Sequence, residues 1–161
     1  MRRITLLPNS ALIAGGINID ANRTTAATAA ANGQGVAPVQ MDLVCGLRPG
    51  TVDVLVFNPP YVPTSEEELA EAIASVDISA AWAGGPRGWL VLDRLLPLIG
   101  AALSPTGVFY LLGVAENAPD EIASELRLRE QAGLRSTVIA ERRAQNERLF
   151  VTRCVCEGVK A

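Results

Sequence analysis

The fold is decided by the stretch Val52-Asp53-Val54-Leu55-Val56-Phe57-Asn58-Pro59-Pro60-Tyr61. Its first six residues are an apolar run interrupted only by Asp53, which is typical of a buried strand. The two prolines lack a backbone N–H and have a fixed φ, so they end the hydrogen-bond ladder and stiffen the turn that follows. Because Asn58 precedes a proline, its backbone is pushed out of the helical region. We therefore expect Asn58 at the carboxyl end of a strand, where open α/β sheets bind ligands.

The side chain of Asn58 suits a particular chemistry. Its amide offers a carbonyl acceptor and two N–H donors, which can grip and orient a planar substrate nitrogen. Tyr61 supplies a flat face close by. This combination favours methyl transfer to an amide or amino nitrogen. Such a reaction depends mainly on alignment of the reactants, a proximity effect of several kcal/mol, so the absence of histidine from the chain is no objection.

Composition and charge limit the class of protein. A chain of 161 residues suits one domain, and 49% hydrophobic against 19% charged residues allows a sizeable core. No apolar run is long enough to span a membrane, and Pro8-Asn9 cuts short the weak signal-peptide pattern that begins at Met1. We expect a cytoplasmic protein with no membrane partner. The net charge of −3 and the lack of a basic stripe give no case for a nucleic-acid partner.

The residues that usually hold metals or activate nucleophiles are scarce. The three cysteines are Cys45, Cys154 and Cys156, and none of them forms the CxxC spacing of a zinc site. Cys154 and Cys156 alternate on an expected strand, so both are interpreted as packing residues of one face. The lack of histidine excludes a His-based triad and the commonest general base. We predict no metal site.

Periodicity and turn signals give the order of elements. The expected strands are Ala11–Ala14, Val36–Met41, Val52–Phe57, Val108–Val114, and a terminal hairpin of Leu134–Glu141 and Leu149–Cys156. The expected helices are Ala21–Ala31, a helix that a Thr64/Glu67 capping box opens and that runs to Ala74, Gly88–Leu103 with a bend at Pro97, and Pro119–Ala132. A turn is expected at Ser104–Gly107. This alternation predicts an α/β fold with a doubly wound, mostly parallel sheet and a C-terminal antiparallel hairpin.

The stretch from Asp53 to Val62 resembles the catalytic motif of the HemK-like release-factor glutamine methyltransferases. The run Ala80-Ala81-Trp82-Ala83-Gly84-Gly85, followed by Gly88, is similar to a loop of their eukaryotic and archaeal branch. Two shorter runs also fit that branch. They are Asp42-Leu43-Val44 with Gly46-Leu47, and Leu103-Ser104-Pro105 with Gly107; in all, the similarity extends from about residue 17 to 156. Asn-Pro-Pro-Tyr alone occurs in many methyltransferases of DNA, RNA and protein.

The resemblance implies a class I methyltransferase, Rossmann-like, that uses S-adenosyl-L-methionine. Members methylate the glutamine of the Gly-Gly-Gln motif in class I peptide-chain release factors. Eukaryotic members work as a heterodimer with a small zinc-binding activator protein.

By residue matching, Asn58 would hold the substrate amide with help from the Pro59 carbonyl, and Tyr61 would pack the target. Pro60 and Trp82 belong to the same substrate side, although Trp82 also fits a simple loop anchor. Asp42 would contact the adenine amino group of the cofactor. Leu43 and Asn58 complete the expected cofactor contacts.

The chain also departs from the family pattern. It lacks the Gly-x-Gly-x-Gly loop, and Gly16 stands where the family has the acid that holds the ribose; Asp20 is nearby, but on a different face of the turn. We therefore expect residues 1–16 to be a divergent segment and residues 17–161 an incomplete methyltransferase domain, truncated before the second strand and without the first strand and Gly-rich loop. In this fold the absent strand lies beside Val52–Phe57. Ala11–Ala14 could keep its family place as the second strand and leave a gap, or it could close up against Val52–Phe57, which we expect because unmade backbone hydrogen bonds are costly.

Three alternatives stay open. The chain is an inactive methyltransferase-like protein, or it methylates a protein lysine, or it methylates a flipped adenine of a nucleic acid. The acidic balance and the Ala-Ala-Trp-Ala-Gly-Gly loop count against adenine. A role in translation termination implies the cytoplasm, with the nucleus as a further compartment.

Overall fold

The computed structural model describes residues 10–75, 82–117, 120–122, 124, 134–144 and 147–156. The chain divides into two compact units, Met1–Gly46 and Leu47–Ala161, and each is described by itself. The boundary expected at residue 16 marks where the family resemblance begins, and it stays a prediction. No helix in the described part of the chain is long and apolar enough to cross a membrane.

The first unit is a β-α-β element. Strand β1 (Leu12–Gly16) leads through helix α1 (Ile19–Ala31) to strand β2 (Val36–Gln40), and the two strands pair in parallel. The helix begins two residues earlier than predicted because Asn18 caps it: its Oδ1 accepts the backbone N–H groups of Asp20 at 2.8 Å and Ala21 at 3.1 Å.

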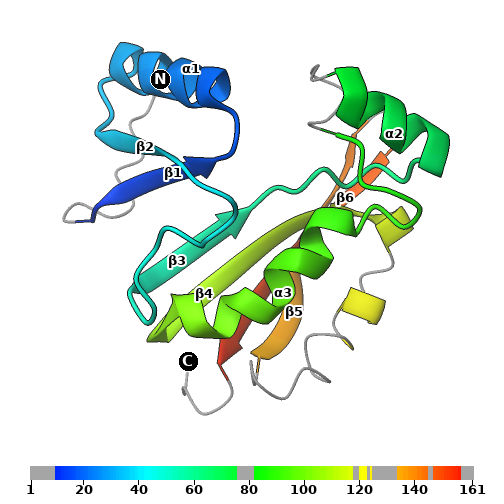
Figure 1. Ribbon diagram of the computed structural model, residues 1–161. Helices are drawn as coiled ribbons and strands as arrows, with labels where there is room; N and C mark the ends of the chain where they lie inside the picture. Colours follow the sequence, from blue (N-terminus) through cyan, green and yellow to red (C-terminus); the bar gives the residue numbers. More distant parts are fainter. Residues whose placement is uncertain are drawn as a thin grey trace. The chain divides into compact units, whose positions relative to one another are not determined.

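The second unit holds a four-stranded sheet in the order β3-β4-β6-β5 (Figure 1). Its strands are β3 (Val52–Phe57), β4 (Leu103–Val114), β5 (Leu134–Ala144) and β6 (Glu147–Cys156). β3 and β4 are parallel, whereas β6 is antiparallel to both β4 and β5. The α/β class and the C-terminal antiparallel hairpin are therefore confirmed, and the sheet of this unit is mixed.

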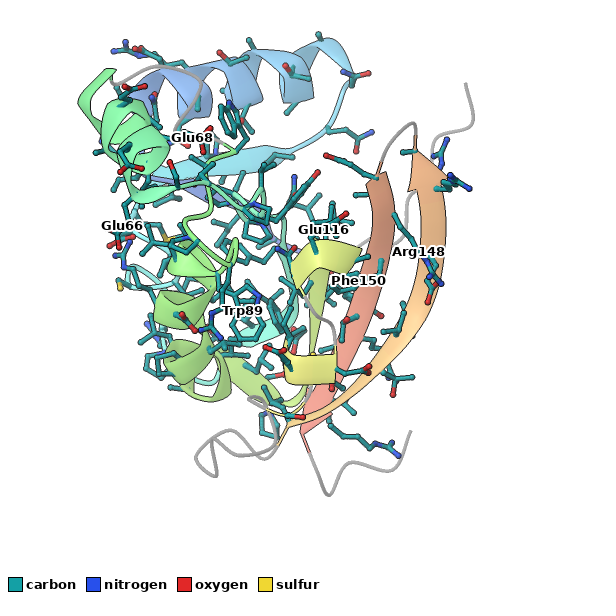
Figure 2. All side chains as sticks on the ribbon, turned by 90° about the vertical axis from the view of Figure 1, so that its right-hand side faces the viewer. Glu66, Glu68, Trp89, Glu116, Arg148 and Phe150 are labelled. Carbon is teal, nitrogen blue, oxygen red and sulfur yellow. The ribbon has the colours of Figure 1, made fainter. Side chains whose placement is uncertain are left out.

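Helix α3 (Leu90–Ala102) supplies much of the core of the second unit. Its residues Leu95, Leu96 and Ile99 are at most 1% exposed, as are Phe109 and Leu111 of β4, on which the helix packs. Figure 2 shows Trp89, the residue before α3, among the side chains between this helix and the strands. The burial of this face positions the two loops that flank α3 and β4.

The expected closing-up of the first strand against Val52–Phe57 would join the two units, and it stays a prediction. Within the first unit, β1 pairs with β2, because the crossover through α1 brings the two strands together as parallel neighbours.

Helix α2 (Glu66–Ser75) begins with a capping box that lies one residue later than predicted. The Ser65 N–H donates to Glu68 Oε2 at 2.9 Å, and the Glu68 N–H donates to Ser65 Oγ at 3.2 Å. Thr64 is buried and accepts a hydrogen bond from the Gly85 N–H instead. Thr64/Glu67 and Ser65/Glu68 have the same spacing, so the sequence pattern alone does not distinguish them.

The turn expected at Ser104–Gly107 is wrong, because these residues are part of strand β4. Its pairing with β3 is irregular, since Val52 lies opposite Leu103 while Val54 lies opposite Val108. A Cβ on Gly107 would lie 2.7 Å from the Val52 carbonyl oxygen, so this irregular stretch needs a glycine. Of the helix expected over Pro119–Ala132, residues 120–122 and 124 are helical, and the rest lies outside the described residues.

Candidate active site

The Asn58–Tyr61 tetrad follows the last residue of β3, as predicted. Asn58 is exposed, Pro59 is buried, and Pro60 and Tyr61 are half-buried. β3 and β4 are parallel, so the tetrad lies at the sheet edge where β4 also ends. β4 is followed there by the short 3₁₀ helix η2 (Ala115–Asn117).

The two sequence motifs that carry the family resemblance meet directly after the tetrad. Val62 pairs in parallel with Ala83: the Val62 N–H donates to the Trp82 carbonyl at 3.1 Å, and the Gly84 N–H donates to the Val62 carbonyl at 2.8 Å. One step further, the N–H groups of residues 64 and 85 donate to the Gly85 carbonyl and Thr64 Oγ1, both at 3.0 Å. Backbone hydrogen bonds therefore join the loop that contains Trp82 to the segment that follows the Asn58–Tyr61 turn.

Two glycines of this loop allow the close approach. A Cβ on Gly84 would lie 2.5 Å from the Pro60 carbonyl oxygen, and a Cβ on Gly88 would clash with the Tyr61 carbonyl oxygen. Gly88 also has φ +67°, which glycine adopts without steric cost. The Gly-Gly spacing of the motif thus has a structural reason in the packing of the turn.

Asn117 ties these segments together, and sequence reasoning missed it. Its Nδ2 donates to the carbonyls of Tyr61 at 2.8 Å and Arg87 at 3.2 Å, and its Oδ1 accepts the Val114 N–H at 3.0 Å. The residue is only 3% exposed. The available signal was a polar residue a few positions after a buried strand, at the same sheet edge as Asn58.

The two tryptophans have different surroundings. Trp89 is 3% exposed; its Nε1 donates to the Asn117 carbonyl at 2.9 Å, and the Arg87 guanidinium lies 4.4 Å from its ring centre. Trp82 is 45% exposed, and its backbone carbonyl accepts the Val62 N–H. The anchor of the loop is therefore Trp89, and a role for the Trp82 ring on the substrate side stays a prediction.

An open hollow of about 320 Å³ in the second unit is lined in part by Asn117, Arg87 and Trp89. It lies next to the tetrad, and Asn58 is not part of its wall. Its lining is Pro63, Pro86, Arg87, Trp89, Glu116, Asn117 and Glu121. Two acidic residues, Glu116 and Glu121, and one basic residue, Arg87, are among the residues that line it.

Of the residues predicted for the cofactor, Asp42 and Leu43 belong to the first unit, and Asn58 belongs to the second. Asp42 is half-buried in a turn just after β2, and its carbonyl accepts the Cys45 N–H at 3.1 Å. Leu43 has φ +52°, the only positive φ of a non-glycine residue in the described part of the chain. This conformation costs about 1–2 kcal/mol, and strained residues of this kind cluster at ligand sites.

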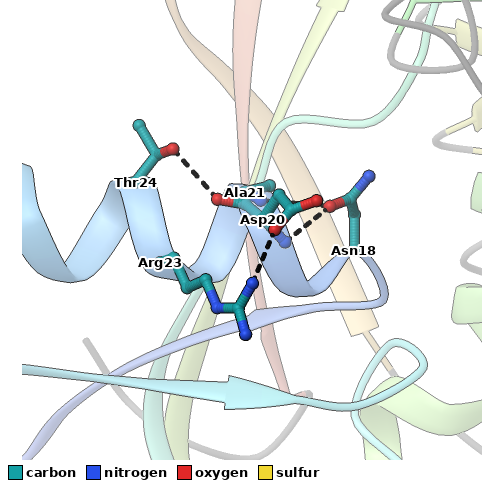
Figure 3. Close-up of polar contacts among 5 residues, drawn as sticks. All are labelled: Asn18, Asp20, Ala21, Arg23 and Thr24. Atoms are coloured by element: carbon teal, nitrogen blue, oxygen red, sulfur yellow. Dashed lines mark hydrogen bonds and ion pairs between the residues drawn. The ribbon is translucent and has the colours of Figure 1, made fainter.

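Gly16, where the resemblance places a ribose-binding acid, lies against the side chain of Asn22. A Cβ on Gly16 would lie 2.8 Å from Asn22 Oδ1, and Asn22 Nδ2 donates to the Gly16 carbonyl at 2.9 Å. Asp20 lies in the first turn of α1, where its carboxylate pairs with Arg23 at 3.0 Å (Figure 3). Both sites are therefore engaged in local structure.

The cysteines agree with the packing interpretation as far as they are described. Cys154 is fully buried, and burial raises the pKa of its thiol to about 12. Cys45 is exposed, and the side chain of Cys156 lies outside the described residues. The described residues contain no group of three or more histidine, cysteine or acidic side chains that could hold a metal ion.

Two solved structures superpose on this chain. The structure of the E. cuniculi Mtq2–Trm112 complex superposes with a TM-score of 0.60 at 22% identity, covering 93% of this chain and 88% of that chain. An rRNA methylase from Streptococcus thermophilus superposes with a TM-score of 0.50 at 11% identity, over 91% of this chain and 73% of that chain. At these identities the likeness establishes the fold.

Curated proteins resemble this chain in sequence. The chain is 48% identical to Methyltransferase HEMK2 of Mus musculus over 140 residues, 85% of this chain and 62% of the relative. It is 40% identical over 116 residues to the eRF1 methyltransferase catalytic subunit mtq2 of Schizosaccharomyces pombe, 71% of this chain and 48% of that protein. No family model matches. The chain is therefore similar in sequence to the HemK-like methyltransferases, and it spans about three fifths of the length of the mouse relative.

Proposed function

We propose that this protein is an S-adenosyl-L-methionine-dependent methyltransferase that modifies the side-chain amide of a glutamine in a class I peptide-chain release factor. The observation that carries the proposal is an exposed Asn58 at the end of β3, on a turn that buried groups brace from outside. The names of the relatives support the substrate class, since the S. pombe protein is described as an eRF1 methyltransferase subunit.

The substrate amide needs to be bound through its two N–H groups. An amide nitrogen is a poor nucleophile because its lone pair is delocalised into the carbonyl. Asn58 Oδ1 and the Pro59 carbonyl are the two acceptors proposed for these N–H groups. Hydrogen bonds to both would favour rehybridisation of the nitrogen and aim its lone pair. Tyr61 and Trp82 would pack against the target side chain, with Pro60 fixing the turn between them.

S-adenosyl-L-methionine, when bound, supplies an electrophilic methyl group. Asp42 fits the adenine end, because a half-buried carboxylate after a strand can accept a hydrogen bond from an amino group. Leu43 provides an apolar neighbour, and its unusual backbone conformation is consistent with a ligand site. Asn58 is proposed to border the methyl-donating end.

An activator partner is part of the proposal. The E. cuniculi relative was solved as a complex with Trm112, and the S. pombe relative is described as a catalytic subunit. We infer a comparable small zinc-binding protein as partner of this chain. A substrate in translation termination would place the work of the protein in the cytoplasm, with the nucleus as a further compartment.

The substrate assignment is tested with isotopically labelled S-adenosyl-L-methionine. The protein, with and without a Trm112-type partner, is incubated separately with a release factor, the same factor with the Gly-Gly-Gln glutamine changed to alanine, a lysine-rich protein and an adenine-containing oligonucleotide. Label in the unmodified release factor alone supports the proposal. Label that persists in the alanine-substituted factor, or that appears only in the other two substrates, contradicts it.

A further inference from the structure

Asn117 uses all the polar atoms of its side chain in one buried network. Both Nδ2 hydrogens have carbonyl partners, on Tyr61 and Arg87, and Oδ1 has the Val114 N–H. We propose that Asn117 is a positioning residue for methyl transfer: it holds the Asn58–Tyr61 turn so that the Asn58 amide and the Pro59 carbonyl keep their relative places. This inference rests on the function proposed above.

The Asn58–Tyr61 turn needs hydrogen bonds from outside the sheet to fix its conformation. The β3 ladder ends at Phe57, and neither Pro59 nor Pro60 has an N–H to donate. The upstream end of the turn is fixed by the pairing of Phe57 with Leu111 in β4. The downstream end is fixed at the Tyr61 carbonyl by Asn117. With both ends held and two φ angles locked by proline, few arrangements of the turn remain.

The same side chain joins three distant parts of the chain. Tyr61 is 56 residues and Arg87 is 30 residues from Asn117 in sequence. The backbone carbonyl of Asn117 accepts the Trp89 Nε1–H, so the buried indole locks η2 against the loop that precedes α3. Asn117 therefore couples the substrate turn to the loop that carries Trp82.

Asparagine is the residue type that this position requires. The site presents two carbonyl oxygens and one N–H to a single buried side chain, which calls for two donors and one acceptor. An aspartate of nearly the same shape keeps the acceptor and loses the donors, and it places a carboxylate oxygen against two carbonyls. Asn117→Asp thus removes the hold on the turn with little change of volume.

The test compares Asn117→Asp with a matched control, Ser104→Ala. Ser104 is 8% exposed and donates to Asp53 Oδ1 at 2.7 Å, so the control also removes a buried polar contact, but at the amino end of β3. For each variant, kcat is expressed per folded molecule, and amide hydrogen exchange is followed by mass spectrometry over residues 61–64 and 82–90. Trp89→Phe is the second variant, since it removes the Nε1 donor to Asn117 while keeping a buried, smaller aromatic ring.

We expect kcat of Asn117→Asp to fall at least about tenfold, equivalent to 1.4 kcal/mol, with KM for the methyl donor within about threefold of wild type. Exchange should quicken in the two segments and stay unchanged elsewhere. Ser104→Ala should have the kcat of wild type, and its amide exchange in residues 61–64 and 82–90 should be as slow as in wild type. If Asn117→Asp does not fold, a fall of kcat in Trp89→Phe beyond that of Ser104→Ala supports the inference.

Two results overturn it: kcat equal to that of the folded control, or unchanged exchange in both segments. If the wild-type protein methylates none of the substrates, the proposed function fails. In that case the exchange experiment alone decides whether Asn117 holds the turn.

Discussion

The side-chain amide of Asn117 donates a 2.8 Å hydrogen bond to the Tyr61 carbonyl, so a residue that follows β4 fixes the turn that follows β3. The two strands are parallel neighbours, and their carboxyl ends meet at one edge of the sheet. The turn that carries the exposed Asn58 is thereby fixed at its downstream end. A fixed turn suits the proposed role of Asn58 in orienting a substrate nitrogen.

Close packing of the two loops predicts a large effect at Gly84. In Gly84→Ala the new Cβ would lie 2.5 Å from the Pro60 carbonyl oxygen and 2.5 Å from Gly88 Cα, both backbone atoms. Overpacking of this kind lowers the free energy of unfolding by about 1–3 kcal/mol. Gly35→Ala is the matched control, because nothing lies within 4 Å of a Cβ there.

Urea unfolding of both variants measures the difference. We expect Gly84→Ala to have a lower midpoint than wild type and Gly35→Ala to lie within about 0.5 kcal/mol of it. Equal stability of the two variants would contradict the close approach of the loops.

The observed capping box predicts different effects for adjacent glutamates. Glu68→Ala removes the carboxylate that accepts the Ser65 N–H at 2.9 Å, so it should destabilise the protein by about 0.5–1 kcal/mol. Glu67→Ala should change stability less, because Glu67 is exposed and lies one position away from the box. The reverse order in thermal unfolding would restore the originally predicted Thr64/Glu67 box.

Burial of Cys154 predicts a loss of stability in alkali. Its pKa is about 12 in the folded protein against 9.0 ordinarily. Since folding favours the neutral thiol, its contribution is fully present below pH 9 and is lost as the pH rises towards 12. The slope is about 1.4 kcal/mol per pH unit between those limits.

The measurement is urea unfolding of wild type and Cys154→Ala at several pH values. The stability advantage of wild type should shrink as the pH rises above 9. A thiol reagent at neutral pH should label exposed Cys45 before Cys154. A constant advantage across the alkaline range, or labelling of Cys154 first, would rule out the buried thiol.

The sequence predicted what proline and local pattern dictate. The bounds of β3 are correct to the residue, because the apolar run ends at a residue that two prolines follow. The helix start at Ile19 and the capping box at Ser65 were displaced by one or two positions, since neighbouring polar residues compete equally well for a cap. The missed features depend on long-range contacts. Leu103 to Gly107 became part of β4 through pairing near Val52.

Asn117 was missed for the same reason. Its partners, Tyr61 and Arg87, are distant in sequence, and an asparagine after a strand is also an ordinary turn residue. Trp82 was expected as a loop anchor or a substrate-side residue, whereas burial identifies Trp89 as the anchor, at 3% exposure against 45% for Trp82. Asp42 was predicted from the residues that follow β2, and its role stays a proposal.

The central claim is that Asn58 orients a glutamine amide for methyl transfer. The most direct measurement is site-mapped mass spectrometry of the Gly-Gly-Gln peptide from a release factor, after incubation with saturating S-adenosyl-L-methionine and either wild type or Asn58→Ala. Asn32→Ala, an exposed asparagine at the end of α1, is the control. The account predicts methylated glutamine with wild type and control, and a rate below about one tenth with Asn58→Ala, a loss above about 1.4 kcal/mol. Glutamine methylation by Asn58→Ala at the wild-type rate would contradict it.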